Sequence, residues 1–104
     1  MMKSCMTCGM PLEGAHTNDI AFETPEGFVC VFDSHEGAIK PGEEIFEGGV
    51  QFFLSEVTHG DQDLAERLTR KNMNTLPYWQ SHPFGRLEGP LATEEEFQKA
   101  MSLL

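Results

Sequence analysis

Cys5-Met6-Thr7-Cys8-Gly9-Met10-Pro11-Leu12 is the stretch that says most about how this chain folds. Two thiols three positions apart lie on the same side of a tight turn, where backbone N–H groups can stabilise them as thiolates. Glycine after the second cysteine supplies the positive φ that such a turn favours. The stretch therefore predicts the first half of a metal-binding knuckle, and a complete site needs further ligands from elsewhere in the chain.

A second, incomplete knuckle lies at Cys30-Val31-Phe32-Asp33, with His35 two residues beyond it. Structural zinc sites are tetrahedral and favour Cys and His, although carboxylates are also used. Asp33 stands where a second Cys-x-x-Cys would place its last sulfur, whereas His35 is the better zinc donor but lies two positions too far. With His35 kept as the alternative fourth ligand, the spacing predicts a zinc site formed by Cys5, Cys8, Cys30 and Asp33.

A β-hairpin between the two half-sites would bring them together. The segment Ile20-Ala21-Phe22 favours an extended conformation, and Thr24-Pro25-Glu26-Gly27 has the composition of a turn. Phe28-Val29-Cys30-Val31-Phe32 is a compact β-prone run. Two strands joined by this turn return the chain, so we expect Cys30 to approach the first knuckle.

A helix is predicted over residues 43–57, after Pro41. Its Gly48-Gly49 pair is unfavourable by about 1 kcal/mol per residue relative to Ala, which indicates either a closely packed neighbour or a kink. The apolar face is wider than one short neighbouring helix readily covers, so it favours contact with a partner or a second copy, with coverage inside the chain as the alternative. This face consists of Ile45, Phe46, Val50, Phe52, Phe53, Leu54 and Val57.

Two further helices are predicted toward the C-terminal end. Asp61 caps a helix that runs to about residue 74, where Pro77 follows. Residues 77–92 have the aromatic, Pro- and Gly-rich composition of a connector. Thr93 followed by Glu96 is typical of a capping box, and it predicts a short last helix over residues 94–102.

The order of these motifs resembles a zinc-ribbon domain family of small bacterial and archaeal proteins. The resemblance rests on Cys-x-x-Cys-Gly-Met-Pro-Leu at residues 5–12, the return to a second knuckle, and two helices, the second ending Asn74-Thr75-Leu76-Pro77-Tyr78-Trp79. It covers roughly residues 3–80 and implies a zinc-ribbon fold with a bound metal. Members carry Cys-x-x-Cys in both knuckles, so Asp33 is a departure, and they sometimes accompany ligand-sensing or transcription-regulator domains.

The predicted fold class is small α+β, with an N-terminal zinc-ribbon-like hairpin and knuckle unit followed by two to three helices. We expect residues 1–80 to form the zinc-ribbon-like domain, and residues 81–104 to pack on that same domain as a connector and short helix. Two other interpretations of the cysteines stay open: they are small buried hydrophobic residues, or they are the remains of a four-cysteine site that has lost one ligand.

Composition narrows the class of protein. The chain has 104 residues, 39% hydrophobic, with eight Phe, and it has no apolar run near the roughly 20 residues of a membrane span. The N-terminal residues lack the apolar region of a signal peptide, so a cytoplasmic protein is expected. Three cysteines suit a disulfide framework badly. A thioredoxin-like redox site is disfavoured, because no helix is predicted to begin at the Cys-x-x-Cys pair.

The net charge of −10 disfavours nucleic-acid binding, which depends on Lys and Arg neutralising phosphates. Arg67, Arg70 and Lys71 form the main basic cluster, and Asp63 and Glu66 precede the two arginines at helical ion-pair spacing. We therefore predict a non-enzymatic protein with a structural zinc site that acts through a protein partner or self-association in a regulatory role. The alternatives are a nucleic-acid-binding ribbon and, less favoured, a zinc- or thiol-dependent enzyme, since the sequence has no His-Glu-x-x-His or phosphate-binding loop.

Overall fold

The N-terminal part of the chain is organised by a β-hairpin. In the structure, a computed structural model that describes residues 3–104, strands β1 (Ile20–Thr24) and β2 (Gly27–Cys30) pair antiparallel around the predicted turn. Phe22 lies opposite Val29 in this pair. The hairpin is therefore confirmed, and it places Cys30 at the end of the returning strand.

The chain leaves the hairpin earlier than its β-prone sequence predicts. Val31–Asp33 form a 3-10 turn and do not continue β2. Two short strands absent from the prediction, β3 (Ser34–His35) and β4 (Ala38–Ile39), then pair antiparallel. The turn directs Asp33 inward and leaves Phe32 on the surface. Tertiary placement of Asp33 thus overrides the strand preference of Val31 and Phe32.

Residues Gly14–Asp19 form a 3-10 helix that the sequence did not predict. Its stabilising contacts are local: the Thr17 hydroxyl donates to the Gly14 carbonyl at 3.0 Å, and the His16 ring lies 2.9 Å from the Asp19 carboxylate. None of its residues is buried, so the sequence has no apolar periodicity from which this helix could be predicted. It begins well after Cys8, so neither thiol of the first knuckle stands at a helix N-terminus.

Helix α1 (Gly42–Phe53) continues into a π-helical turn, Leu54–Thr58, so the predicted helix is confirmed with a widened last turn. The question raised by the two glycines is answered at Gly49. A Cβ built there would lie 2.8 Å from the Cγ2 methyl of Thr69, whereas one built at Gly48 meets nothing within 4 Å. A closely packed neighbour, helix α2 (Gln62–Asn74), therefore accounts for one of the two glycines.

The predicted caps of the later helices are present. The Asp61 carboxylate accepts the Leu64 N–H at 3.1 Å at the start of α2. Thr93 and Glu96 form a reciprocal capping box for α4 (Glu94–Ser102). These local signals position both helices as the sequence predicts.

The connector prediction was wrong at its start, because Pro77–Ser81 form a short helix, α3. Pro77 suits the first turn of a helix, where its missing N–H costs nothing. Trp79 is buried on this helix and joins the core. A single buried side chain in five residues is too short a pattern to reveal helical periodicity.

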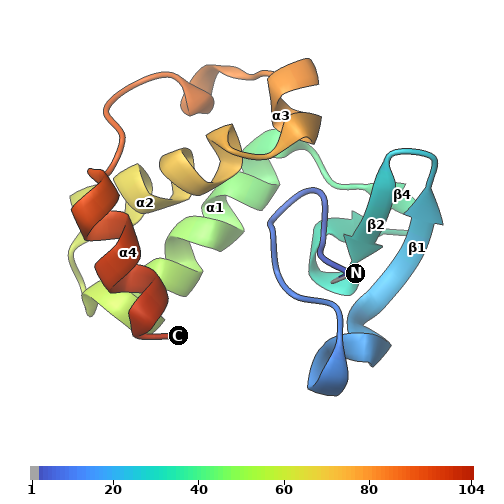
Figure 1. Cartoon of the computed structure of the whole chain (residues 1–104). Helices are drawn as coiled ribbons and strands as arrows, with labels where there is room; N and C mark the ends of the chain where they lie inside the picture. Colours follow the sequence, from blue (N-terminus) through green and yellow to red (C-terminus); the bar gives the residue numbers. More distant parts are fainter. Residues whose placement is uncertain (1–2) are drawn as a thin grey trace.

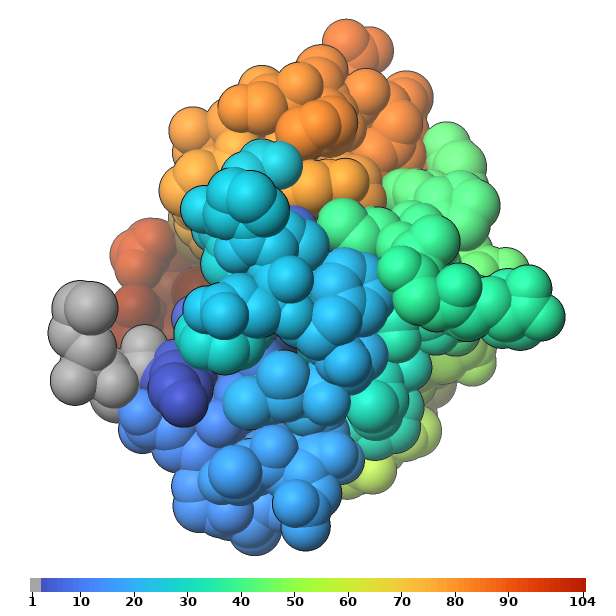
Figure 2. Space-filling model, turned by 90° about the vertical axis from the view of Figure 1, so that its right-hand side faces the viewer, coloured from blue at the N-terminus to red at the C-terminus, as the bar shows by residue number. Residues whose placement is uncertain are grey.

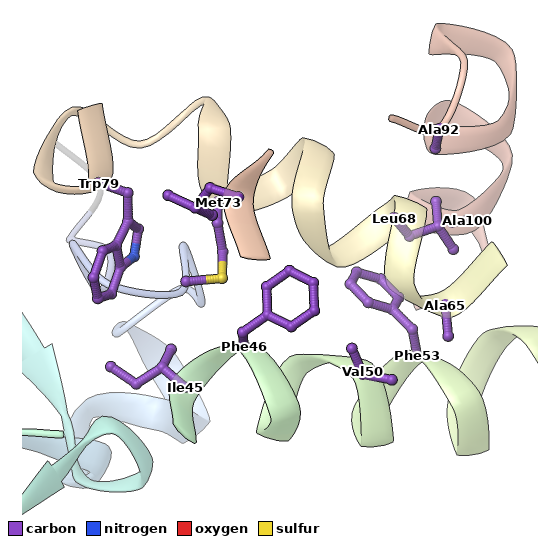
Figure 3. Packing of buried hydrophobic residues seen from close by; sticks show 11 residues of the cluster. Ile45, Phe46, Val50, Phe53, Ala65, Leu68, Met73, Trp79, Ala92 and Ala100 are labelled. Carbon is purple, nitrogen blue, oxygen red and sulfur yellow. The ribbon is translucent and has the colours of Figure 1, made fainter. Parts of the chain in front are cut away.

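The main hydrophobic core lies between α1 and α2, with α3, α4 and the segment between them covering its ends (Figures 1 and 3). Phe46 lies at its centre, where the Phe84 ring meets it edge-on and the Arg86 guanidinium lies 4.3 Å from its ring centroid. Phe52, in contrast, is 47% exposed. Most of the wide apolar face of α1 is thus covered within the chain. The buried members of this core are Ile45, Phe46, Val50, Phe53, Ala65, Leu68, Met73, Trp79, Leu87, Ala92 and Ala100.

The two hairpins lie beside the helices, and the N-terminal loop runs between β2 and the helical layer (Figure 1). Figure 2 shows this N-terminal part, in blue and cyan, across the middle of one face, with the orange segment above it and the green segment to its right. Together the elements make a small α+β structure with two two-stranded antiparallel sheets. Within residues 3–104, no helix has the length and apolar character that crossing a bilayer would require.

Candidate metal centre

The first knuckle is a tight turn closed by its own backbone. The Gly9 N–H donates to the Cys5 carbonyl at 2.8 Å, and the Cys5 N–H donates to the Met10 carbonyl at 2.9 Å. Gly9 has a φ of +80°, as the sequence predicts for the residue after the second cysteine. The turn places Cys5 and Cys8 side by side, with Cys5 fully buried.

The second knuckle approaches from the end of β2. The backbone N–H of Cys30 points at the Cys5 sulfur at 3.4 Å, which fixes the two knuckles against each other. The following 3-10 turn carries Asp33 inward, and its carbonyl accepts the Lys40 N–H at 2.8 Å. Asp33 itself is only 7% exposed.

One sulfur from each of Cys5, Cys8 and Cys30 and a carboxylate oxygen of Asp33 all lie within 4.8 Å of one another. The Cys8 and Cys30 sulfurs are 3.7 Å apart, and the Cys5 sulfur is 3.5 Å from Asp33 Oδ2. These four residues lie close enough to hold a metal ion. The structure therefore brings together the four residues that the spacing of the knuckles predicted.

His35, the alternative fourth ligand, does not join this cluster. Its side chain is 75% exposed, and its Nε2 lies 3.8 Å from Glu36 Oε1. His35 is the exposed residue of the short strand β3 and is not among the residues that cluster. The other histidines are also engaged elsewhere: His59 ends the π-helical turn in a left-handed conformation, and His82 stacks on Tyr78.

Thr7 belongs to the centre, although the sequence analysis did not single it out. This residue is fully buried, and its hydroxyl donates to Asp33 Oδ2 at 2.6 Å. Its backbone N–H points at the Cys5 sulfur at 3.4 Å. The available signal was a hydroxyl residue inside the Cys-x-x-Cys turn, but its contact with a residue 26 positions away could not be read from local sequence.

The helical half holds the first knuckle through two backbone carbonyls. Trp79 Nε1 donates to the Thr7 carbonyl at 2.8 Å, and Asn72 Nδ2 donates to the Cys8 carbonyl at 2.9 Å. These donors come from α3 and α2 respectively. The turn that presents the thiols is thus anchored both by its own backbone and by side chains of distant helices.

The electrostatics of the cluster favour a bound cation. Hydrogen bonds from Cys30 and Cys8 hold the pKa of Cys5 far below its usual value, and the hydrogen bond to Cys5 raises the pKa of Cys30 to about 12. The pKa of Cys8 is also raised, chiefly by its hydrogen bond to Cys30, and burial raises the pKa of Asp33. Packed this closely, the groups disfavour one another's ionisation, and a nearby positive charge would favour their charged forms.

The donor set fits a soft or borderline divalent metal. Three thiolates and one carboxylate supply four donors, the number that a tetrahedral zinc site uses. Thiolate-rich sites select zinc, copper(I) or iron–sulfur chemistry over magnesium and calcium, which prefer oxygen donors. Within the described residues, this is the one group of three or more His, Cys, Asp or Glu side chains close enough together to hold an ion.

The basic cluster on α2 is occupied by contacts within the chain. Arg67 contacts Asp63 at 2.9 Å, as predicted, and Glu96 at 2.6 Å. The predicted pairing of Glu66 with Arg70 was wrong. Arg70 donates to the carbonyls of Arg86 and Pro90, and Glu66 lies 3.6 Å from Arg86. The connector between α3 and α4 reaches these groups only in the folded chain, so helical spacing alone could not reveal them.

Comparisons with known protein families, with curated proteins and with solved structures gave no significant match to this chain. The resemblance to the zinc-ribbon family therefore rests on the motifs of the sequence. What the structure adds is a cluster of three thiols and one carboxylate, three of them buried and Cys8 partly buried, that could bind a metal.

Proposed function

We propose that this protein binds one zinc ion through Cys5, Cys8, Cys30 and Asp33, and that the ion has a structural role. The observation that carries the proposal is the convergence of four potential ligand atoms within 4.8 Å of one another, from two knuckles 25 residues apart in the chain. A bound zinc would neutralise charge that the cluster does not otherwise accommodate, and it would hold the two knuckles together.

Several features support a structural and not a catalytic zinc. A catalytic zinc keeps a position open for water or substrate, whereas four protein donors fill a tetrahedral site. Cys5, Cys30 and Asp33 are buried, which restricts the approach of a substrate. The remaining donor, Cys8, is partly buried, and its carbonyl is held by α2.

The resemblance and the charge together support a zinc-ribbon-like module that acts by binding another protein, in a regulatory role. A nucleic-acid-binding ribbon is the second candidate, but Arg67, Lys71 and Arg86 each pair with a carboxylate of the same chain. We also infer that residues 81–104 belong to the same domain as the knuckles. Glu94 and Glu96 of α4 pair with Lys71 and Arg67 of α2, which ties the last helix to the rest.

Elemental analysis of protein purified without added metal tests the proposed site. We expect about one zinc per chain in the wild type, the stoichiometry of a four-donor structural site. Asp33→Ala should weaken zinc retention during dialysis against a chelator, because it removes a buried donor. His35→Ala is the matched control, since His35 lies outside the cluster, and it should retain zinc like the wild type.

The opposite order of retention would make His35 the fourth ligand. A wild-type protein without any bound metal would contradict the proposed centre and favour a site that has lost its function. Another metal in place of zinc would contradict the proposed identity of the ion.

A further inference from the structure

The shortest contact of the Asp33 carboxylate is with a buried hydroxyl group. Thr7 Oγ1 lies 2.6 Å from Asp33 Oδ2 and 3.0 Å from the Cys5 sulfur. A hydroxyl has one proton and can donate to one of these acceptors at a time. The shorter contact is with the carboxylate, and the Cys5 sulfur already has the N–H groups of Thr7 and Cys30 directed at it. The Thr7 hydroxyl therefore donates its hydrogen bond to Asp33 Oδ2 and not to the Cys5 sulfur.

Thr7 is itself fixed from the opposite side. Its carbonyl accepts a hydrogen bond from the indole N–H of Trp79, and both residues are buried. Figure 3 shows Trp79 at one end of the hydrophobic core, beside Met73 and Ile45. Packing in the core fixes Trp79, and its indole N–H fixes the Thr7 backbone. The Thr7 hydroxyl in turn donates a hydrogen bond to Asp33.

We propose that Thr7 is a positioning residue for the metal centre, which orients Asp33 as the fourth ligand and is itself anchored by Trp79. The inference rests on the proposed zinc function and extends it to residues that do not bind the metal. Hydrogen bonds to metal-binding residues fix the orientation of the ligand, and their removal typically lowers metal affinity about 10–100-fold. A carboxylate in place of a thiolate needs this support because either oxygen can rotate away from the metal.

The test compares zinc affinities, measured by competition with a chromogenic chelator. Thr7→Val removes the hydroxyl but keeps the shape of the buried side chain, and we expect zinc binding about 10-fold weaker than in the wild type. Thr7→Ser keeps the hydroxyl and should recover most of the lost affinity. The absorption spectrum of the Co²⁺-substituted protein should change in Thr7→Val and stay close to wild type in Thr7→Ser, because it reports the ligand geometry.

A double-mutant cycle separates positioning from general stability. In an Asp33→Ala background, Thr7→Val should change zinc affinity by less than about twofold, because the residue through which it acts is gone. An equal loss in both backgrounds would show that Thr7 acts through Cys5 or the fold, and it would overturn the inference.

Trp79→Phe tests the other end of this chain of contacts, and it remains informative if Thr7→Val fails to fold. Loss of the indole N–H should weaken zinc binding. This decrease in affinity should disappear in the Asp33→Ala background. Asn74→Ala is the control, since Asn74 donates to the carbonyls of Arg70 and Leu87 and not to the knuckle. It should leave zinc affinity unchanged.

The outcomes distinguish the two proposals. Tight zinc binding by the wild type and equally by Thr7→Val and Trp79→Phe would overturn the positioning role alone. A wild type that binds no zinc would overturn the proposed function, and the positioning role with it.

Discussion

The two halves of this molecule bury different kinds of side chain. The helical half, residues 42–104, has a continuous hydrophobic core of eleven buried residues. In the N-terminal half, the corresponding cluster contains two thiols and one aliphatic residue, Cys5, Cys30 and Leu12, and beside it lie the buried polar groups of Thr7 and Asp33. Burial of apolar surface stabilises the helical half, by roughly 25 cal/mol for each Å² removed from water. The stability of the N-terminal half depends on whether the polar groups of its cluster have bonding partners.

The halves meet partly through directed polar contacts. Trp79 and Asn72 donate to carbonyls of the first knuckle, and these hydrogen bonds link the metal centre to α3 and α2. Regions with little apolar burial open at lower free energy than a packed core. The comparison therefore indicates two regions of unequal stability, the weaker of which a metal would reinforce.

Removal of the proposed zinc ion should have the largest effect and should reveal this difference in stability. Structural zinc contributes an apparent binding free energy of about 10–16 kcal/mol in small zinc-finger peptides, so its loss should disorder the knuckles and the hairpins. We expect amide protection in residues 3–40 to fall on chelation, measured by hydrogen exchange. The helical signal in far-UV circular dichroism should largely remain.

Readdition of zinc should restore the protection, which serves as the control for irreversible damage. Simultaneous loss of protection in both halves would show that they form one cooperative unit of equal stability.

Substitution of the neighbouring residues Phe52 and Phe53 should give the next largest difference in stability. Phe53 is 5% exposed in the core, so Phe53→Ala should lower the free energy of unfolding by about 3–5 kcal/mol. Phe52 lies on the outer side of α1, and Phe52→Ala should change stability by less than about 1 kcal/mol. Urea unfolding followed by circular dichroism measures both. Similar losses for the two variants would contradict the burial of Phe53 and the exposure of Phe52.

The same position tests the predicted self-association. Light scattering over a concentration series on the wild type and on Phe52→Glu reports whether this exposed ring joins two copies. Conversion of a dimer to a folded monomer would place Phe52 in an interface. A monomeric wild type at every concentration would contradict self-association.

The smallest expected effects come from the adjacent glycines of α1, and they have opposite signs. Gly49→Ala would press a methyl group against Thr69, whose hydroxyl is fixed by a 2.8 Å hydrogen bond to the Ala65 carbonyl. Such overpacking typically costs about 1–3 kcal/mol, which exceeds the gain of about 1 kcal/mol in helix propensity. Gly48→Ala has no neighbour to displace and should stabilise the protein by about 1 kcal/mol.

Thermal unfolding of the two variants measures this difference. Zinc affinity should be unchanged in both, because neither glycine contacts the knuckles. Stabilisation by Gly49→Ala would show that α1 and α2 are less closely packed than the structure indicates.

Local signals in the sequence determined several elements of the fold. Asp61 and the Thr93–Glu96 pair set the starts of α2 and α4, and the turn at residues 24–27 set the hairpin. The spacing of the two knuckles also selected the four residues that converge. Each of these signals acts over a few residues, where backbone geometry follows directly from residue type.

Only the tertiary structure decided how the centre is supported. The short helix α3 has no clear periodicity, and it is held by distant contacts of Trp79 with the core and with the Thr7 carbonyl. Thr7 meets Asp33 and Trp79 across 26 and 72 positions, and Arg86 reaches Phe46 across the core. The type of a residue limits the hydrogen bonds and contacts that it can make. Which partner it contacts depends on distance in the folded structure, and the order of residues along the chain does not reveal that distance.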